Sequence, residues 1–388
     1  MKLLNHSIKP RILWLLITCV ALLFSMPLIG IQAQKTREDT QSTMRWEHTD
    51  DGLKRRFETR GKPEFTDDYT DVKSVPEGGW VIIEEHRDSQ SLRYEVRRDA
   101  AGQITRTFYV NGALRPMDQT TKSWLAKFVL DVVRHGGLDA DRRVQRILAQ
   151  RGVPGVLSEI DQISGDYAKR IYYQELIKQA NLDAPALRDV LRQMARVIAS
   201  DYEQSQLLIG IAPMLTGKEA AIQPFFDAVS TIKSDYEHSR VLKAVLKEST
   251  PSRALLTLIA ASTKTISSDY EKAAVLKGVA AVYLDDPELR DIFFQTISTI
   301  GSDYERRGVL TALVKTKKQS EEVLRLLLDA ATGISSDYEK ATFLVEVSNV
   351  YTGETRLRSA FLKAVESIKS DYERGRVLSA LLKNKQIG

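Results

Sequence analysis

The chain has 388 residues, of which 43% are hydrophobic and 28% are charged, the composition of an ordinary globular protein. This composition excludes a wholly disordered or collagen-like chain, and the length allows more than one domain. The net charge of +5 includes Lys2, Lys9 and Arg11 of an N-terminal segment without acids, so the remainder is nearly neutral. A nearly neutral body lacks the overall charge expected of a general nucleic-acid-binding protein.

Residues 1–33 have the layout of a signal peptide, because basic residues precede an uncharged run from Ile12 to Ile31 and a small residue, Ala33. The run is also long enough to stay in the membrane as an anchor, so residues 12–31 are either removed or retained. Residues 34–43 are then a linker, and we expect the protein in the bacterial periplasm or secreted. The only cysteine, Cys19, lies in this segment, so a mature chain beginning after it forms no disulfide.

Residues 44–116 are predicted to form a small β-rich module. Leu92, Tyr94 and Val96 alternate with charged residues, which indicates a strand with one solvated face. The dipeptides Asp51-Gly52 and Asn111-Gly112 are typical of tight hairpins. The sequence therefore predicts an antiparallel meander, with strands at Leu53 to Thr59, Trp80 to Glu85, Leu92 to Arg98 and Ile104 to Val110.

Residues 117–137 are predicted to contain a connecting helix, from about Gln119 to Arg134. One apolar stripe follows a helical period, and Gly136-Gly137 ends it. The stripe consists of Trp124, Leu125, Phe128, Val129, Val132 and Val133.

A repeat dominates residues 138–388. Copies of Ser-Asp-Tyr-Glu recur at an interval of 35 residues once and then 34 residues five times. A fixed period of this length predicts stacked two-helix units, so the fold class is α+β, a β-meander module followed by an α-solenoid of about seven HEAT-like repeats. The repeated acids and aromatics are Asp166, Tyr167, Asp201, Tyr202, Asp235, Tyr236, Asp269, Tyr270, Asp303, Tyr304, Asp337, Tyr338, Asp371 and Tyr372.

Each full copy has the spacing of a capping box, in which a serine and a glutamate satisfy each other's amides at a helix start. The first copy, with Gly165 and Ala168, lacks both residues. The second helix of a unit is expected at, for example, Ser252 to Thr265 or Glu321 to Thr332. The predicted caps are Ser200, Glu203, Ser234, Glu237, Ser268, Glu271, Ser302, Glu305, Ser336, Glu339, Ser370 and Glu373.

The repeated aspartates are expected to complement the helix dipole, and the tyrosines to pack between repeats. Burial of this kind predicts that Tyr270→Ala lowers stability by about 3 kcal/mol. The alternative is an exposed aromatic ladder that binds a peptide. In that case the loss is below about 1 kcal/mol.

Six copies carry a basic residue or histidine three positions after the aspartate. These residues either bind an acidic partner or form a solvated helix face, paired with the preceding aspartates. They are Lys169, His238, Lys272, Arg306, Lys340 and Arg374.

No catalytic motif, cofactor site or metal site is predicted. The histidines are scattered and no His-x-x-x-His pair occurs, which argues against zinc. An acidic loop with Glu64, Asp67, Asp68 and Asp71 contains ligand types that calcium prefers, but a solvated turn fits its spacing better.

Three stretches, Arg93 to Asp99, Tyr109 to Gly112 and Trp124 to Ala126, followed by the Ile-x-Ser-Asp-Tyr-Glu copies, resemble bacterial extracytoplasmic helical-repeat proteins. Similar repeats are fused to membrane metallopeptidases of the BlaR and MecR type. The peptidase part of those fusions is missing here, so no catalytic residue carries over. The resemblance covers about residues 75–388 and implies a sensing or scaffolding module of the cell envelope.

The first hypothesis is therefore a non-enzymatic exported scaffold whose solenoid binds a protein or peptide and no nucleic acid. It contacts a membrane only through the N-terminal segment, if that segment is retained. An alternative is an enzyme, or a regulatory subunit of one, with a site in the β module, the acidic loop being the candidate. A third possibility is a structural spacer.

Overall fold

The computed structural model describes residues 42–383 except 249–250, 284, 317–318 and 352–354. The predicted signal or anchor and most of the predicted linker lie outside the described residues. The chain divides into two units, one containing the described residues up to Pro63 with Ser74–Pro116, the other Glu64–Lys73 with the residues from Met117 onward. None of the described helices is long and apolar enough to cross a membrane.

The first unit contains a six-stranded antiparallel sheet, as the meander prediction required. The first and last strands of this sheet were not predicted. The Asp51-Gly52 and Asn111-Gly112 turns both have the positive φ angles of tight hairpins, as their dipeptides indicated. In spatial order the strands are β1 (Thr43–Asp50), β2 (Leu53–Arg60), β5 (Trp80–Arg87), β6 (Gln90–Arg98), β7 (Ile104–Val110) and β8 (Ala113–Leu114).

The register of the sheet separates an apolar face from a charged face. One row of directly opposed residues crosses five strands and is buried, namely Trp46, Phe57, Ile83, Tyr94 and Phe108. Successive residues of a strand point to opposite faces, so the neighbouring row lies on the other side. That row alternates in charge: Glu47, Arg56, Glu84 and Arg93.

Residues Glu64–Lys73 belong to the helical unit, although the sequence placed them in the β module. They contain most of a two-stranded sheet of β3 (Glu64–Phe65) and β4 (Val72–Ser74). The physical reason is Tyr69, whose buried hydroxyl donates to Asp139 Oδ2 at 3.3 Å. The guanidinium groups of Arg143 and Arg146 lie 4.8 and 5.3 Å from the centre of its ring.

The connecting helix is confirmed as α1 (Gln119–Gly136), with its N-cap at Asp118 and a left-handed Gly137 at its end. Of its predicted stripe only Trp124 is not fully buried. The next helix, α2 (Ala140–Ile160), is interrupted at Gly152, where φ is 64°.

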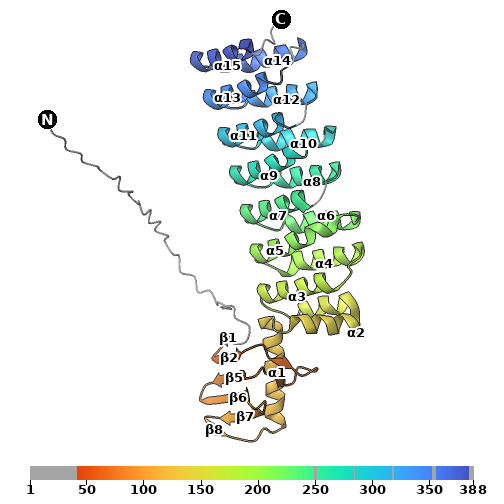
Figure 1. Cartoon of the computed structure of the whole chain (residues 1–388), viewed down its shortest axis with the longest axis vertical. Helices are drawn as coiled ribbons and strands as arrows, with labels where there is room; N and C mark the ends of the chain where they lie inside the picture. The colour runs from red at the N-terminus through yellow and green to blue at the C-terminus, as the bar shows by residue number, and fades with distance from the viewer. Residues whose placement is uncertain (1–41, 249–250, 284, 317–318, 352–354, 384–388) are drawn as a thin grey trace, which may run out of the picture. The chain divides into compact units, whose positions relative to one another are not determined.

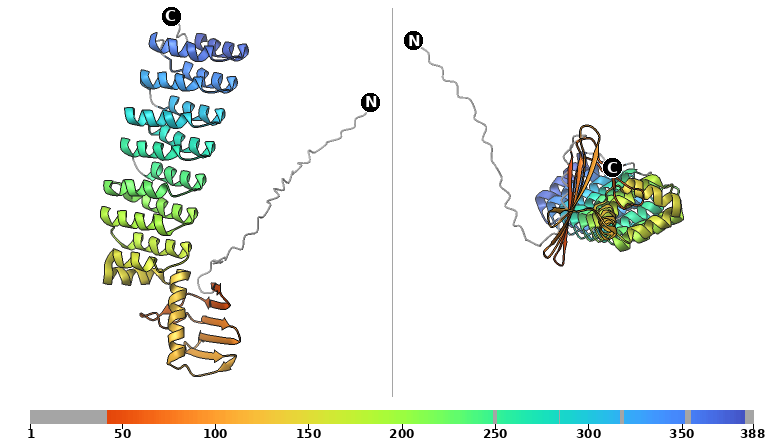
Figure 2. Two further views of the ribbon diagram at one scale, coloured as in Figure 1. Left: turned by 180° about the vertical axis from the view of Figure 1, so that it is seen from behind. Right: turned by 90° about the horizontal axis from the view of Figure 1, so that it is seen from below.

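The remaining helices form two parallel layers, which Figures 1 and 2 show from several sides. The helices that begin at the aspartate of each copy form the first layer: α3 (Asp166–Gln179), α5 (Asp201–Ile211), α7 (Asp235–Glu248), α9 (Asp269–Ala281), α11 (Asp303–Val314), α13 (Asp337–Ser348) and α15 (Asp371–Lys383). The second layer contains α4 (Ala184–Val197), α6 (Glu219–Val229), α8 (Arg253–Lys264), α10 (Pro287–Ser298), α12 (Glu321–Thr332) and α14 (Thr355–Glu366), and a short 3-10 helix η1 (Ala212–Leu215) follows α5. The α-solenoid is thus confirmed.

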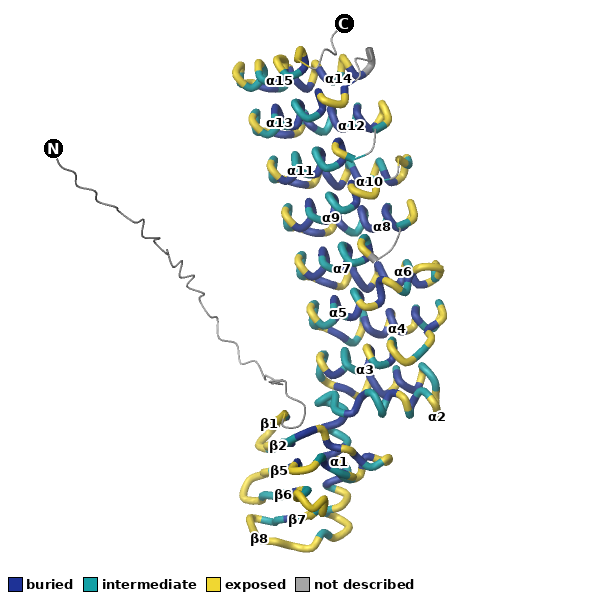
Figure 3. The backbone as a smooth tube through the Cα atoms, viewed as in Figure 1, coloured by how far each residue is buried: buried dark blue, intermediate teal, exposed yellow. Residues whose placement is uncertain are grey.

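The core of the solenoid lies between the layers, as the burial colours in Figure 3 show. The isoleucine that precedes each tetrapeptide is buried in every copy, from Ile163 to Ile368. Each first-layer helix from α7 onward also carries an apolar pair six and seven residues after its aspartate, such as Val275 and Leu276, which are fully buried. Leu378 of α15 is an exception, since no described helix follows α15.

The first-layer helices are joined through the repeated aspartates. In six copies the carboxylate of one repeat accepts hydrogen bonds from two consecutive backbone amides at the start of the next, at 2.7 to 3.2 Å. Asp303, for example, accepts from the amides of Ser335 and Ser336 at 3.1 and 2.7 Å. The same bonds hold the pKa of Asp337 below its usual value. The aspartates therefore connect repeats, which the dipole prediction did not include.

We expect Asp303→Ala to lower the free energy of unfolding by about 2 kcal/mol, since it removes two hydrogen bonds to a charged acceptor. Urea denaturation measures this change. Asp371→Ala is the matched control, because the Asp371 side chain is 96% exposed and pairs only with Arg374 of its own helix among the described residues. Equal losses in the two variants would contradict the inter-repeat role.

A buried ion cluster joins α1 to α2. Glu159, which is 4% exposed, accepts from Arg134 Nε at 2.7 Å and from Arg143 Nη2 at 2.7 Å. Burial raises the pKa of Glu159, but hydrogen bonds and charges from the two arginines outweigh burial and hold the pKa below its usual value.

We expect Glu159→Gln to cost about 3 kcal/mol at neutral pH, because two arginines lose their common counter-charge. A lowered pKa in the folded state stabilises the protein above the unfolded value of 4.5, and this stability is lost as the pH falls through the folded value. Wild-type stability should therefore fall more steeply below pH 4.5 than that of the variant. Denaturant melts across this pH range measure it, and parallel curves would refute the assignment.

Candidate interaction site

The seven repeated tyrosines are exposed, which corrects the prediction that they pack between repeats. Their exposure ranges from 37% at Tyr167 to 78% at Tyr372. Each ring follows directly after the aspartate that starts a first-layer helix, so all lie along the edge where these helices begin. We call this row, Tyr167, Tyr202, Tyr236, Tyr270, Tyr304, Tyr338 and Tyr372, the tyrosine ladder.

The tyrosines point outward because other residues make the contacts between repeats. Each serine caps its helix as predicted, accepting from the glutamate amide at 3.3 to 3.4 Å. The serine amide, however, donates to the aspartate of the preceding repeat. The capping box is therefore only half formed.

In five of the six copies that contain it, the glutamate side chain contacts the preceding first-layer helix instead of the serine amide, whereas Glu373 pairs with Arg376 of its own helix. Glu203 pairs with Arg170, and Glu339 pairs with Arg307. Glu305 lies 2.8 Å from Lys277 Nζ. In two further copies a serine donates to the carboxylate, as from Ser239 to Glu271, and from Ser205 to Glu237 at 2.5 Å.

The basic residues three positions after each aspartate do not form a solvated stripe, so both interpretations from the sequence are wrong for most copies. Lys272, Lys340 and His238 are each only 4% exposed. Their donors cap the ends of second-layer helices: Lys340 Nζ reaches Ser367 O at 3.0 Å. Burial lowers the pKa of Lys340 and of His238.

The same contact recurs in copies that differ in sequence. Lys169 Nζ donates to Val197 O at 2.7 Å, and Arg306 donates to Gly333 O. In the copy without a basic residue, Gln204 Nε2 donates to Thr231 Oγ1 at 2.6 Å. A signal was present in the sequence, because all seven side chains at this position are nitrogen donors or contain a ring nitrogen. The predicted i, i+3 pairing is found in two copies, between Lys169 and Asp166 at 3.5 Å and between Arg374 and Asp371 at 2.6 Å.

Arginines hold several ladder rings in place. The guanidinium carbon of Arg170 lies 5.1 Å from the centre of the Tyr167 ring, and that of Arg307 lies 5.1 Å from the Tyr304 ring. Arg376 of α15 lies 5.2 Å from the Tyr338 ring of the preceding first-layer helix. Each of these arginines also pairs with a carboxylate, Arg170 with Glu203, Arg307 with Glu339 and Arg376 with Glu373, so the charges of these arginines beside the rings are balanced.

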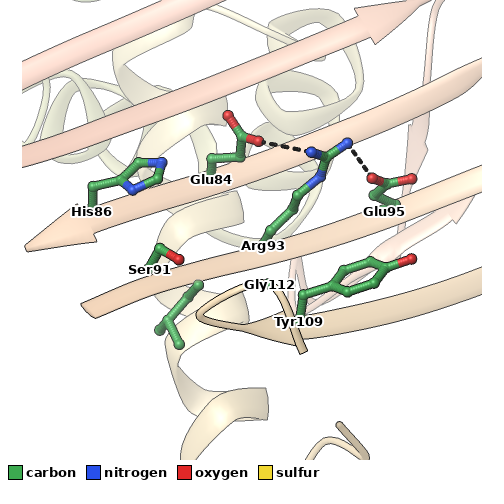
Figure 4. A pocket seen from close by; sticks show the side chains of 8 residues that line it. Glu84, His86, Ser91, Arg93, Glu95, Tyr109 and Gly112 are labelled. Atoms are coloured by element: carbon green, nitrogen blue, oxygen red, sulfur yellow. Dashed lines mark ion pairs between the residues drawn. The ribbon is translucent and has the colours of Figure 1, made fainter. Parts of the chain in front are cut away.

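A second candidate is a hollow of about 420 Å³ on the charged face of the sheet. Figure 4 shows Arg93 between Glu84 and Glu95, with ion pairs to both. His86 and Ser91 lie at one end of the hollow and Tyr109 at the other. Because its carboxylates are paired with arginines, the hollow presents little unpaired charge to a ligand.

The acidic loop is a hydrogen-bonded turn. Asp68 Oδ1 accepts from the hydroxyls of Thr66 and Thr70 at 2.7 and 2.8 Å, and these bonds hold the pKa of Asp68 below its usual value. Asp67 pairs with Arg146 of α2 at 2.9 Å. Across the described ranges, no three His, Cys, Asp or Glu side chains are placed to hold a metal ion.

Searches against protein-family models, curated proteins and solved structures find no match to this chain. The resemblance to envelope repeat proteins accordingly stays an expectation from the sequence.

We expect Tyr304→Ala to lower stability by less than about 1 kcal/mol, because Tyr304 is 60% exposed. Phe343→Ala, in a fully buried side chain of α13, should cost about 3 to 5 kcal/mol. Urea melts of the two variants give the comparison. A loss of 3 kcal/mol or more for Tyr304→Ala would show that the ladder rings support the fold.

Proposed function

We propose that this protein is a non-enzymatic, exported interaction protein that binds an extended segment of a partner protein along the tyrosine ladder. The observation that carries the proposal is the exposure of one tyrosine at the same position of all seven copies. Tyrosine is enriched where proteins bind each other, since its ring supplies apolar area and its hydroxyl a hydrogen bond.

The different roles of the residues within one repeat support this proposal. Aspartate, glutamate and the donor three positions later make the contacts between helices, as described above. The tyrosine side chain adds little to these contacts, so packing does not explain its recurrence in every copy. A row of aromatic groups that exposes apolar area to water is a feature of binding surfaces.

The cellular role is part of the same proposal. The signal-like N-terminal segment favours a location outside the cytoplasm, and the resemblance to envelope repeat proteins favours a role in sensing or scaffolding. The charged face of the β-sheet, where Arg93 pairs with Glu84 and Glu95, is not part of this proposed binding surface. No specific observation favours an enzyme over this function, because the carboxylates of the acidic loop and of the hollow are engaged in their own turn and ion pairs.

A display library of random peptides tests the proposal. We expect the full-length protein to enrich a family of related sequences, and the triple variant Tyr270→Ala/Tyr304→Ala/Tyr338→Ala to bind them at least about tenfold more weakly, since aromatic anchors dominate such interfaces. Loss of all enrichment, or equal binding by the triple variant, would refute the ladder as the binding surface.

The matched control is Val282→Ala/Leu382→Ala. Both side chains are exposed and apolar, at 40% and 65%, but neither belongs to the ladder. This variant should bind the enriched peptides as the wild type does, and thermal melts should show that both variants are folded.

A further inference from the structure

The spacing of the ladder restricts the conformation of the segment it can bind. Packed helices lie about 8 to 10 Å apart, and each first-layer helix contributes one exposed ring. The aspartate bonds between successive helix starts recur with distances of 2.7 to 3.2 Å in six copies, so neighbouring rings keep a nearly constant spacing. A long ligand must therefore repeat at this interval.

Among regular backbone conformations, polyproline II matches this interval best. A β-strand presents the same face every two residues, about 6.6 Å, and again at about 13 Å. An α-helix turns every 5.4 Å or so. Polyproline II turns every three residues, at about 3.1 Å per residue, so one face recurs every 9.3 Å or so.

The chemistry of the ladder also fits this conformation. A polyproline II segment makes no internal hydrogen bonds, so its carbonyls are available to tyrosine hydroxyls and arginine donors. Proline rings pack on aromatic faces, which is how aromatic-lined grooves recognise such segments. The acids and bases beside the rings pair with each other, as Arg307 does with Glu339, so the surface favours a neutral, ring-bearing ligand over a polyanion.

The rings are also held before binding. Arg170, Arg240 and Arg307 each lie 5.1 to 5.7 Å from the centre of a ladder ring on their own helix. A polyproline II segment is itself stiff, so both partners lose little conformational freedom on association. A rigid ladder and a rigid ligand bind well only if their intervals agree.

From these observations we infer that the tyrosine ladder binds a proline-rich segment in the polyproline II conformation, one turn per repeat. The inference rests on the proposed function and names its ligand class. Seven rings correspond to a segment of roughly 21 residues, at three residues per turn. Affinity should rise with each added turn until the ladder is filled.

Fluorescence anisotropy with labelled oligoproline peptides tests the inference on the full-length protein. A peptide of about 15 residues spans about five turns, and a glycine-serine peptide of the same length is the control ligand. We expect oligoproline to bind and glycine-serine not to bind. Peptides lengthened by three residues at a time should bind progressively more tightly.

Variants separate the rings from their hydroxyls. Tyr270→Ala/Tyr304→Ala/Tyr338→Ala should weaken oligoproline binding at least about tenfold, whereas the matching Tyr→Phe triple variant should weaken it less, since the ring faces remain. Val282→Ala/Leu382→Ala should leave binding unchanged. Absence of oligoproline binding, equal binding of the glycine-serine peptide or no effect of the alanine variant overturns the inference.

The outcomes also distinguish this inference from the proposed function. If the display library yields ladder-dependent peptides without proline while oligoproline fails to bind, the polyproline inference fails and the proposed function stands. If neither the library peptides nor oligoproline bind, the inference and the proposed function both fail.

A chito-oligosaccharide is the third ligand to test, because sugar rings also stack on tyrosine. Ladder-dependent binding of the sugar alone overturns the polyproline inference and the proposed protein partner together.

Discussion

The solenoid depends on one recurring interaction, a carboxylate of one repeat that accepts two consecutive backbone amides of the next. Backbone amides at a helix start have no partner within the helix, so each needs an acceptor from elsewhere. The aspartate supplies that acceptor across the repeat boundary, in bonds such as those from Asp303 to Ser335 and Ser336. This contact links the starts of neighbouring helices, and the same edge contains the exposed tyrosines.

This interaction also explains the roles of the neighbouring residues. Because the serine amide donates to an aspartate, the glutamate does not bond to that amide. Its side chain pairs with the preceding first-layer helix instead, as Glu305 does with Lys277. The donor three positions after the aspartate satisfies carbonyls at the end of the second helix, as Lys340 does. The aspartate, the glutamate and the donor three positions after the aspartate thus hold the stacked helices together, whereas the tyrosine is exposed.

Much of the fold was predictable because its signals are local. Alternation and turn dipeptides located the four central strands of the sheet, and the 34-residue period located the helices, including α12 (Glu321–Thr332) at its predicted limits. Residues 64–73 were assigned wrongly, since their place depends on Tyr69, Asp139 and two arginines far along the chain. The repeated tyrosines were identified by residue, but they were expected to pack between repeats, and the structure places them in solvent, as in the alternative reading.

The sequence by itself determined the period, the helix starts and the residues that recur at each start. Recurrence alone does not say whether a side chain faces a neighbouring helix or the solvent, because both kinds of position repeat with the same interval. Only the tertiary structure decided that aspartate bonds to the next repeat while tyrosine is exposed. That choice depends on how one helix start packs beside the next, a relation between residues 32 to 34 positions apart that no local pattern contains.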